Sequence, residues 1–227
     1  MRLYNTLTRQ PETFEPLRDG TVRMYTCGLT VYARGHIGNF RTFLFEDVLR
    51  RWLEASGYDV FHVMNLTDVD DKTIRGAEER GLALDVYTAP FIASFQADLA
   101  ALNVVPATAY PRATEHIDGM QAIIARLLAA GYAYESDGSV WFRIAADADY
   151  GKRSGLRIEE ARVGERGAND EYETEDVRDF VLWKGAKPGE PSWPSPWGPG
   201  RPGWHIECSA MSAAFLGETF DIHCGGV

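Results

Sequence analysis

Three thiols in the 227-residue chain could bind a soft metal ion, and they lie far apart, at Cys27, Cys208 and Cys224. An odd number at such wide spacing does not fit the disulfide framework of a small secreted domain. We therefore expect free thiols or metal ligands. Since no sequence-local zinc pattern links them, residue type alone favours buried core cysteines at Cys27 and Cys208.

The run of residues 36–39 (HIGN) could bind an anion. It lies where a predicted strand passes through a loop into a helix, so backbone N–H groups and the helix dipole would face a phosphate. Gly38 permits close approach, and the imidazole of His36 can meet a phosphate. On these four residues alone, the simpler interpretation is a surface histidine with Asn39 near a helix start.

A group of carboxylates follows a second predicted strand, at Asp68, Asp70 and Asp71. Carboxylates suit magnesium, so a divalent-metal site is one interpretation. A solvated strand end with Lys72 nearby is the simpler one.

The segments that must position these residues predict a βαβ unit. Residues 21–32 are typical of a strand, residues 39–57 have helical spacing of apolar residues, and residues 59–66 predict a second strand. Because ligands collect at the carboxyl ends of parallel strands, we expect Cys27 and Thr67 to be neighbours. The fold class predicted is therefore α/β, with a doubly wound, Rossmann-like parallel sheet that binds a nucleotide.

The middle of the chain predicts an inserted α+β domain. Its clearest signal is Asp137-Gly138, a two-residue turn between alternating segments in residues 132–144. Residues 159–179 are rich in acidic side chains and predict a loop. Further segments predict three helices before this hairpin, and a helix and a strand after it; these cover residues 74–80, 86–102, 117–130, 205–216 and 219–223.

Composition sets limits on the class of protein. A hydrophobic content of 45% and 25% charged residues are ordinary for a globular protein. The net charge of -10 would repel a polyphosphate backbone at long range, which argues mildly against nucleic-acid binding. No run of about 18 apolar residues is present, so we expect no signal peptide, no membrane partner and a cytoplasmic location.

Longer motifs include the residues discussed above. They are residues 25–39 (YTCGLTVYARGHIGN), 65–72 (NLTDVDDK) and 200–211 (GRPGWHIECSAM). Together they resemble the motifs of cysteinyl-tRNA synthetases, a family of class I aminoacyl-tRNA synthetases. Residues 221–227 (DIHCGGV) resemble the start of a further family motif, so the resemblance covers essentially the whole chain.

The resemblance implies a pocket for cysteine. Cys27 and Cys208 would be two ligands of Zn²⁺, which would bind the substrate thiol, and Thr67, Trp204 and His223 would contact the rest of the substrate. A metal with soft ligands and an open position suits this task, because it binds a thiolate directly whereas a hydrophobic pocket separates near-isosteres poorly.

Cys224 follows His223 directly, but adjacent side chains of a strand point to opposite faces, so only one of them should face the site. By resemblance this is His223, and we leave Cys224 outside the metal site. The resemblance leaves the three aspartates mainly structural.

The resemblance also implies the reaction. The carboxylate of cysteine would attack the α-phosphate of ATP, which is bound with Mg²⁺, and the cysteinyl group would then pass to the 3′ end of tRNA(Cys). His36 and Asn39 would be the catalytic residues, and with Gly38 they would bind ATP. No protein nucleophile is needed. We expect a monomer.

The expected domains are residues 1–112, the first part of the catalytic domain; residues 113–203, the inserted connective domain with a Pro-rich loop; and residues 204–227, the return to the catalytic domain. The family's remaining zinc ligands, second signature loop and anticodon-binding domain are expected beyond Val227. The parallel sheet is therefore expected to be incomplete.

Two rival functions remain open at this point. A cysteine ligase of the mycothiol pathway resembles this family and uses an amino sugar as acceptor; an assay of both acceptors would separate the two. The chain could instead be a cysteine- or nucleotide-binding module without turnover, which tight ATP binding without reaction would favour.

Overall fold

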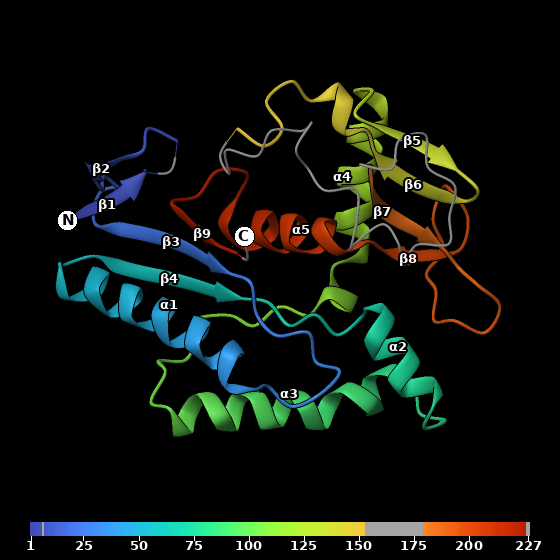
Figure 1. Ribbon diagram of the computed structural model, residues 1–227, viewed down its shortest axis with the longest axis horizontal. Helices are drawn as coiled ribbons and strands as arrows, with labels where there is room; N and C mark the ends of the chain where they lie inside the picture. Colours follow the sequence, from blue (N-terminus) through green and yellow to red (C-terminus); the bar gives the residue numbers. More distant parts are fainter. Residues whose placement is uncertain (6, 153–178, 226–227) are drawn as a thin grey trace. The chain divides into compact units, whose positions relative to one another are not determined.

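A computed structural model describes residues 1–5, 7–152 and 179–225, and the side chain of Trp204 is outside this description. The chain forms two compact units. We call Glu15–Gly119 with Glu207–Gly226 the parallel-sheet unit, and Met1–Phe14 with Met120–Ile206 the antiparallel-sheet unit. The elements of both are labelled in Figure 1.

The parallel-sheet unit is built on three strands in the order β4-β3-β9. Both outer strands run parallel to β3, and Thr26 at its end pairs with Met64 on one side and Cys224 on the other. The carboxyl ends of all three strands therefore meet at one edge. The strands are β3 (Thr21–Thr26), β4 (Asp59–Met64) and β9 (Ile222–Cys224).

Helix α1 makes the crossover from β3 to β4 that parallel strands require. It spans Ile37–Ala55, and Gly57 follows with a φ of 94°, a left-handed conformation that suits glycine. The predicted βαβ unit is confirmed. The predicted extension of the first strand to residue 32 is wrong, because pairing stops at Thr26 and resumes only as one bridge between Thr30 and Thr67.

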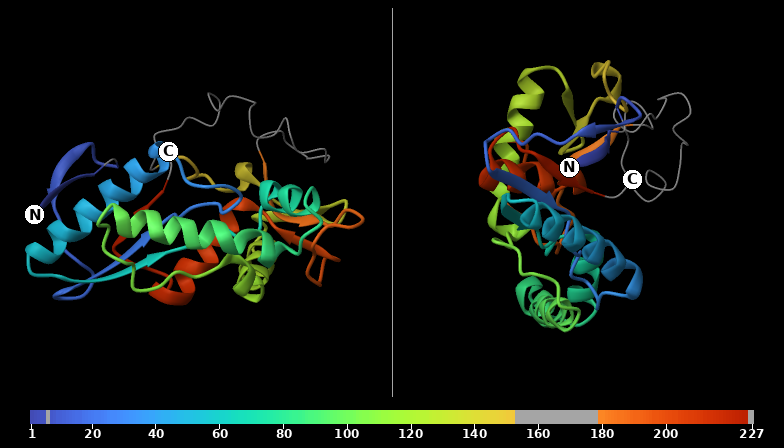
Figure 2. Two further views of the ribbon diagram at one scale, coloured as in Figure 1. Left: turned by 90° about the horizontal axis from the view of Figure 1, so that it is seen from below. Right: turned by 90° about the vertical axis from the view of Figure 1, so that its left-hand side faces the viewer.

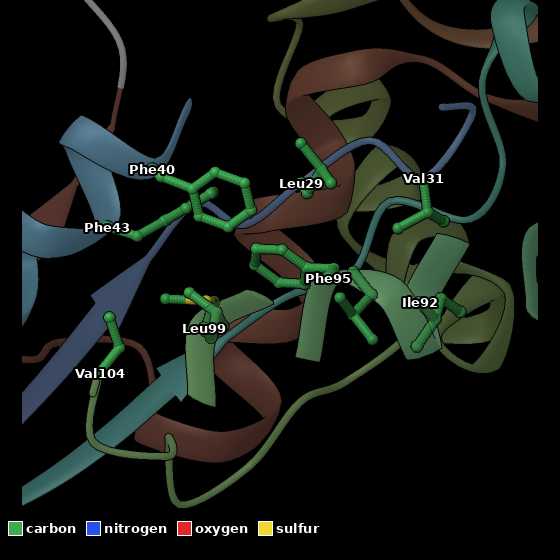
Figure 3. Packing of buried hydrophobic residues seen from close by; sticks show 10 residues of the cluster. Leu29, Val31, Phe40, Phe43, Ile92, Phe95, Leu99 and Val104 are labelled. Atoms are coloured by element: carbon green, nitrogen blue, oxygen red, sulfur yellow. The ribbon is translucent and has the colours of Figure 1, made fainter. Parts of the chain in front are cut away.

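Aromatic rings join α1 to α3 (Leu84–Ala101) in the core of this unit (Figure 3). Phe43 of α1 and Phe95 of α3 lie edge to face, with ring centroids 5.1 Å apart. Both views of Figure 2 show these two helices side by side. The cluster also contains Leu29, Val31, Phe40, Met64, Leu66, Ile92, Leu99 and Val104. This unit also contains α2 (Asp71–Glu78), α3 (Leu84–Ala101), the 3-10 turn η1 (Ala113–Glu115) and most of α5 (Trp204–Leu216).

The antiparallel-sheet unit contains a four-stranded sheet in the order β5-β6-β7-β8. The predicted hairpin is confirmed: Asp137 and Gly138 have φ angles of 49° and 72°, as the mirror-image turn of a two-residue hairpin requires. Trp141 and Trp183 are buried in the sheet. Its strands are β5 (Ala133–Ser136), β6 (Ser139–Phe142), β7 (Phe180–Gly185) and β8 (Gly200–Pro202), with the 3-10 turn η2 (Ile144–Ala146) after β6.

A hairpin near the N-terminus was not predicted. It pairs β1 (Arg2–Asn5) with β2 (Gln10–Thr13) in antiparallel register. Its side chains are mostly exposed, so no alternation of apolar and polar residues marks it in the sequence.

The divisions between the two units fall inside α4 (Ile117–Ala129) and α5 (Trp204–Leu216). The predicted domain boundaries after residues 112 and 203 remain a proposal. Most of the predicted acidic loop, residues 159–178, lies outside the described residues. Among the helices that are described, none is both long enough and apolar enough to cross a bilayer.

Candidate functional site

The thiols of Cys27 and Cys208 come together at the carboxyl ends of the parallel strands. Cys27 follows β3 directly and Cys208 lies in the first turns of α5; their Sγ atoms are 3.8 Å apart. Two sulfurs at about 2.3 Å from a tetrahedral zinc ion are separated by about 3.8 Å, so the pair fits two corners of such a site. Donor chemistry and spacing both suit zinc.

A hydrogen bond links the two thiols. The hydrogen bond between them lowers the pKa of Cys27 and raises the pKa of Cys208. Burial adds to the effect on Cys208. To hold a metal ion together, both thiols would have to lose their protons, because metal ligands must be deprotonated.

Cys224 lies on β9 beside this pair but is linked to it through the backbone. The N–H of Cys27 donates to the carbonyl oxygen of Cys224 at 3.0 Å. Burial, with a smaller effect from Glu46, raises the pKa of Cys224 to about 12, so it stays a thiol at neutral pH. Within the described residues, no group of three or more His, Cys, Asp and Glu side chains is placed to hold a metal. The exclusion of Cys224 from the metal site stays a prediction.

His223 precedes Cys224 on β9 and is exposed. Its ring lies 5.2 Å from the ring of Tyr25, centroid to centroid, and 5.9 Å from that of Phe220. His223 therefore contacts the carboxyl end of β3, two residues before Cys27.

Thr67 lies on the loop after β4, and backbone hydrogen bonds join it to the loop after β3. Its N–H donates to Leu29 and its carbonyl oxygen accepts from Val31, both at 3.1 Å. The Thr67 side chain is buried and accepts a hydrogen bond from Asn65 Nδ2 at 3.1 Å. The structure therefore brings the Cys27 and Thr67 loops together, as the parallel sheet predicts.

His36 and Asn39 cap the start of α1. His36 Nδ1 accepts from the N–H of Gly38 at 3.1 Å, and Asn39 Oδ1 accepts from the N–H of His36 at 3.1 Å. This is a capping box, which is the simpler interpretation of the motif. Because Nδ1 is an acceptor, the neutral imidazole carries its proton on Nε2, where it can donate to a ligand.

The aspartates after β4 have structural partners. Asp68 accepts from the N–H and the hydroxyl of Thr114, at 3.0 and 2.6 Å. Asp70 caps α2 by accepting from the N–H of Lys72 at 2.8 Å. These contacts favour the structural interpretation over a magnesium site.

Three buried polar residues near the thiols were missed in the sequence. They are Asn65, Glu207 and Glu46, each 2% exposed or less. Burial raises the pKa of Glu46 to about 8 and holds that of Glu207 well above its usual range. The one available signal was a carboxylate among apolar residues of a helix, which is uncommon in a buried position.

Trp204 is the first residue of α5, and its side chain lies outside the described part of the structure. Its predicted contact with cysteine therefore stays a prediction.

The chain is a mixed α/β protein in which two thiols lie at the carboxyl ends of parallel strands, and comparison with known proteins defines its class. The family described as "tRNA synthetases class I (C) catalytic domain" matches residues 13–227. The chain therefore belongs to this family of class I tRNA synthetase catalytic domains.

Individual relatives agree with the family. Over its whole length the chain is 55% identical to a cysteine–tRNA ligase of Thioalkalivibrio sulfidiphilus and 53% identical to one of Pyrococcus horikoshii. It covers 49% and 47% of these relatives, so it spans about half their length.

A solved structure from Campylobacter jejuni supports the fold alone. It is described provisionally as an arginyl-tRNA synthetase and is similar with a TM-score of 0.53 and 11% identity. The similarity covers 92% of this chain and 48% of that one.

Proposed function

We propose that the chain activates cysteine with ATP, as part of a protein that attaches cysteine to tRNA(Cys). The observation that carries this proposal is the 3.8 Å separation of the Cys27 and Cys208 sulfurs at the ends of the parallel strands. The family and the cysteine–tRNA ligase names of its relatives support it. They also favour a tRNA acceptor over the amino sugar of the rival ligase.

The proposed reaction is an in-line displacement. A carboxylate oxygen of cysteine bonds to the α-phosphorus of ATP, the bond from that phosphorus to the leaving oxygen breaks, and pyrophosphate departs with Mg²⁺. The chain's role is to align the reactants and to stabilise charge on the phosphates. The start of α1 would do this with the positive end of its helix dipole and the Nε2 proton of His36. The N–H of Gly38 holds the imidazole of His36, and the side chain of Asn39 holds the backbone of His36.

Cys27 and Cys208 would hold zinc, which when bound supplies an open coordination position for a thiolate. Serine has no thiolate to offer, so it cannot make the bond on which recognition depends. Thr67, Trp204 and His223 would orient the remainder of the cysteine.

Cysteine-dependent exchange of labelled pyrophosphate into ATP tests this proposal. We expect exchange by the zinc-supplied chain with cysteine and none with serine. An equal rate with serine would contradict the selection by the thiol pair. The variant His36→Ala should lower the exchange rate by about tenfold to a hundredfold, as for loss of one charge-stabilising donor; an unchanged rate would remove His36 from the mechanism.

A further inference from the structure

Asn65 occupies a fully buried position where the loops after β3 and β4 meet α5. Its Oδ1 accepts a hydrogen bond from the N–H of Gly28 at 3.0 Å. Its Nδ2 donates to the hydroxyl oxygen of Thr67 at 3.1 Å. The thiol of Cys208 lies 4.0 Å from Oδ1, at the limit of a weak S–H···O contact. One amide thus connects three segments that are far apart in the sequence.

The orientation of this amide follows from its partners. A backbone N–H can only donate, so the atom that faces Gly28 must be the oxygen Oδ1. The nitrogen Nδ2 is then directed at Thr67, whose hydroxyl oxygen accepts. This bond occupies one lone pair of Thr67 Oγ1, and the hydroxyl of Thr67 makes a hydrogen bond to the carboxyl group of Glu207. The two contacts fix the rotamer of the Thr67 side chain, and the second lone pair remains for another partner.

The backbones of the two loops are also in direct contact at this point. A Cβ on Gly28 would lie 1.8 Å from the carbonyl oxygen of Asn65, so only glycine fits. The position of Asn65 relative to the residue after Cys27 is therefore fixed by both its main chain and its side chain.

From this geometry we propose that Asn65 is a positioning residue for cysteine, which acts through Thr67 and the Gly28 loop. The inference rests on the proposed function, because it assumes that Thr67 and the thiol pair contact the same substrate. Asn65 sets the distance between the group that binds the sulfur and the hydroxyl that binds the remainder of the amino acid. It does not itself touch the substrate.

The test compares two Asn65 variants in the zinc-supplied 227-residue chain, with calorimetric titration of cysteine as the readout. Asn65→Ala removes both hydrogen bonds. Asn65→Asp keeps an oxygen for the N–H of Gly28 and removes only the donor to Thr67. We expect both variants to bind cysteine about tenfold more weakly, as for one lost hydrogen bond in a pocket. The KM for ATP in pyrophosphate exchange should stay within about twofold.

A double-mutant cycle with Thr67→Val separates positioning from a general loss of structure. If Asn65 acts through Thr67, Asn65→Asp should weaken cysteine binding less than about twofold in the Thr67→Val background. The full tenfold effect in that background would overturn the proposal. Unchanged cysteine affinity in both Asn65 variants would do so too.

Failure of the proposed function has a different result. If the unsubstituted chain binds cysteine and serine equally, or binds neither, the function proposed above is wrong, and this inference falls with it. If the unsubstituted chain selects cysteine and the Asn65 variants do so equally well, only the inference about Asn65 is wrong. Thermal unfolding of each variant shows that it is folded before titration.

Discussion

Buried carboxyl groups differ between the two units of the molecule in how many hydrogen-bond partners they have. In the antiparallel-sheet unit, Asp179 accepts from the hydroxyl of Tyr134 at 3.0 Å and from the N–H of Ile144 at 2.9 Å. In the parallel-sheet unit, Glu46 and Glu207 are buried more deeply, and each has one oxygen without a hydrogen-bond partner.

This difference distinguishes a carboxylate that stabilises the fold from carboxyl groups that belong to the candidate site. Buried polar groups are normally paired, since an unpaired one costs about 1–3 kcal/mol. Asp179 obeys this rule and connects β5, β7 and the turn after β6. Glu46 and Glu207 break it beside the two thiols, and groups with strongly shifted pKa values cluster at functional sites. We therefore expect changes at Asp179 to affect folding alone, and changes beside the thiols to affect stability, ligand binding or both.

The largest effect on stability is expected from Glu46→Gln. Burial raises the folded-state pKa of Glu46 to about 8 from a usual value of 4.5, so the folded chain loses stability as pH rises from 4.5 to 8. The glutamine side chain of the variant has no charge to bury, so the variant should be more stable than the unsubstituted chain at pH 8 by several kcal/mol.

Urea unfolding at pH 5 and pH 8 measures this difference. Glu54→Gln is the matched control, because Glu54 lies on the same helix but at the surface, where it pairs with Arg50 at 2.9 Å. A pH dependence that is the same in both variants would contradict the burial of the Glu46 charge.

The next effect is expected from a methyl group added to Gly28. Gly28→Ala places a Cβ against the carbonyl oxygen of Asn65 and should destabilise the chain by about 1–3 kcal/mol. It should also weaken cysteine binding more than tenfold, because the two loops must separate. Gly138→Ala is the control in the other unit: its positive φ makes alanine costly by about 1 kcal/mol, with no change in cysteine binding. An equal loss of cysteine affinity in the two variants would contradict the expectation that the Gly138 turn does not contribute to cysteine binding.

The smallest effect on ligand binding is expected from Asp179→Asn. The amide oxygen of the variant can still accept from the N–H of Ile144, but the amide nitrogen cannot accept the hydroxyl proton of Tyr134. The free energy of unfolding should therefore fall by about 1–3 kcal/mol. Cysteine affinity, measured by titration, should remain within about twofold. A tenfold loss of cysteine affinity with unchanged stability would show that Asp179 contributes to ligand binding and would contradict its structural role.

Local signals explain what could be predicted of the fold. In the crossover helix α1, apolar residues recur at helical spacing from Phe40 to Leu53, and the Asp137-Gly138 turn predicts its hairpin. The end of β3 could not be predicted, because apolar residues continue to Val31 after the strand pairing has stopped at Thr26.

The candidate site depends on contacts between distant parts of the chain, so the sequence shows less of it. Only the family resemblance pointed to Cys27 and Cys208 as a pair. Asn65 and Glu207 lie inside quoted motifs, but nothing in their spacing indicates that one side chain connects Gly28 to Thr67. Glu46 lies outside every motif and is identified only by its burial.

The central claim is that Cys27 and Cys208 bind one metal ion together, and titration with Co²⁺ tests it most directly. Cobalt substitutes for zinc in tetrahedral sites, and bonds to thiolates give it a charge-transfer absorption. We predict one cobalt ion per chain, with an absorption that is lost in Cys27→Ser and in Cys208→Ser and retained in Cys224→Ser. Retention of the absorption in either of the first two variants, or its loss in Cys224→Ser, would contradict the account.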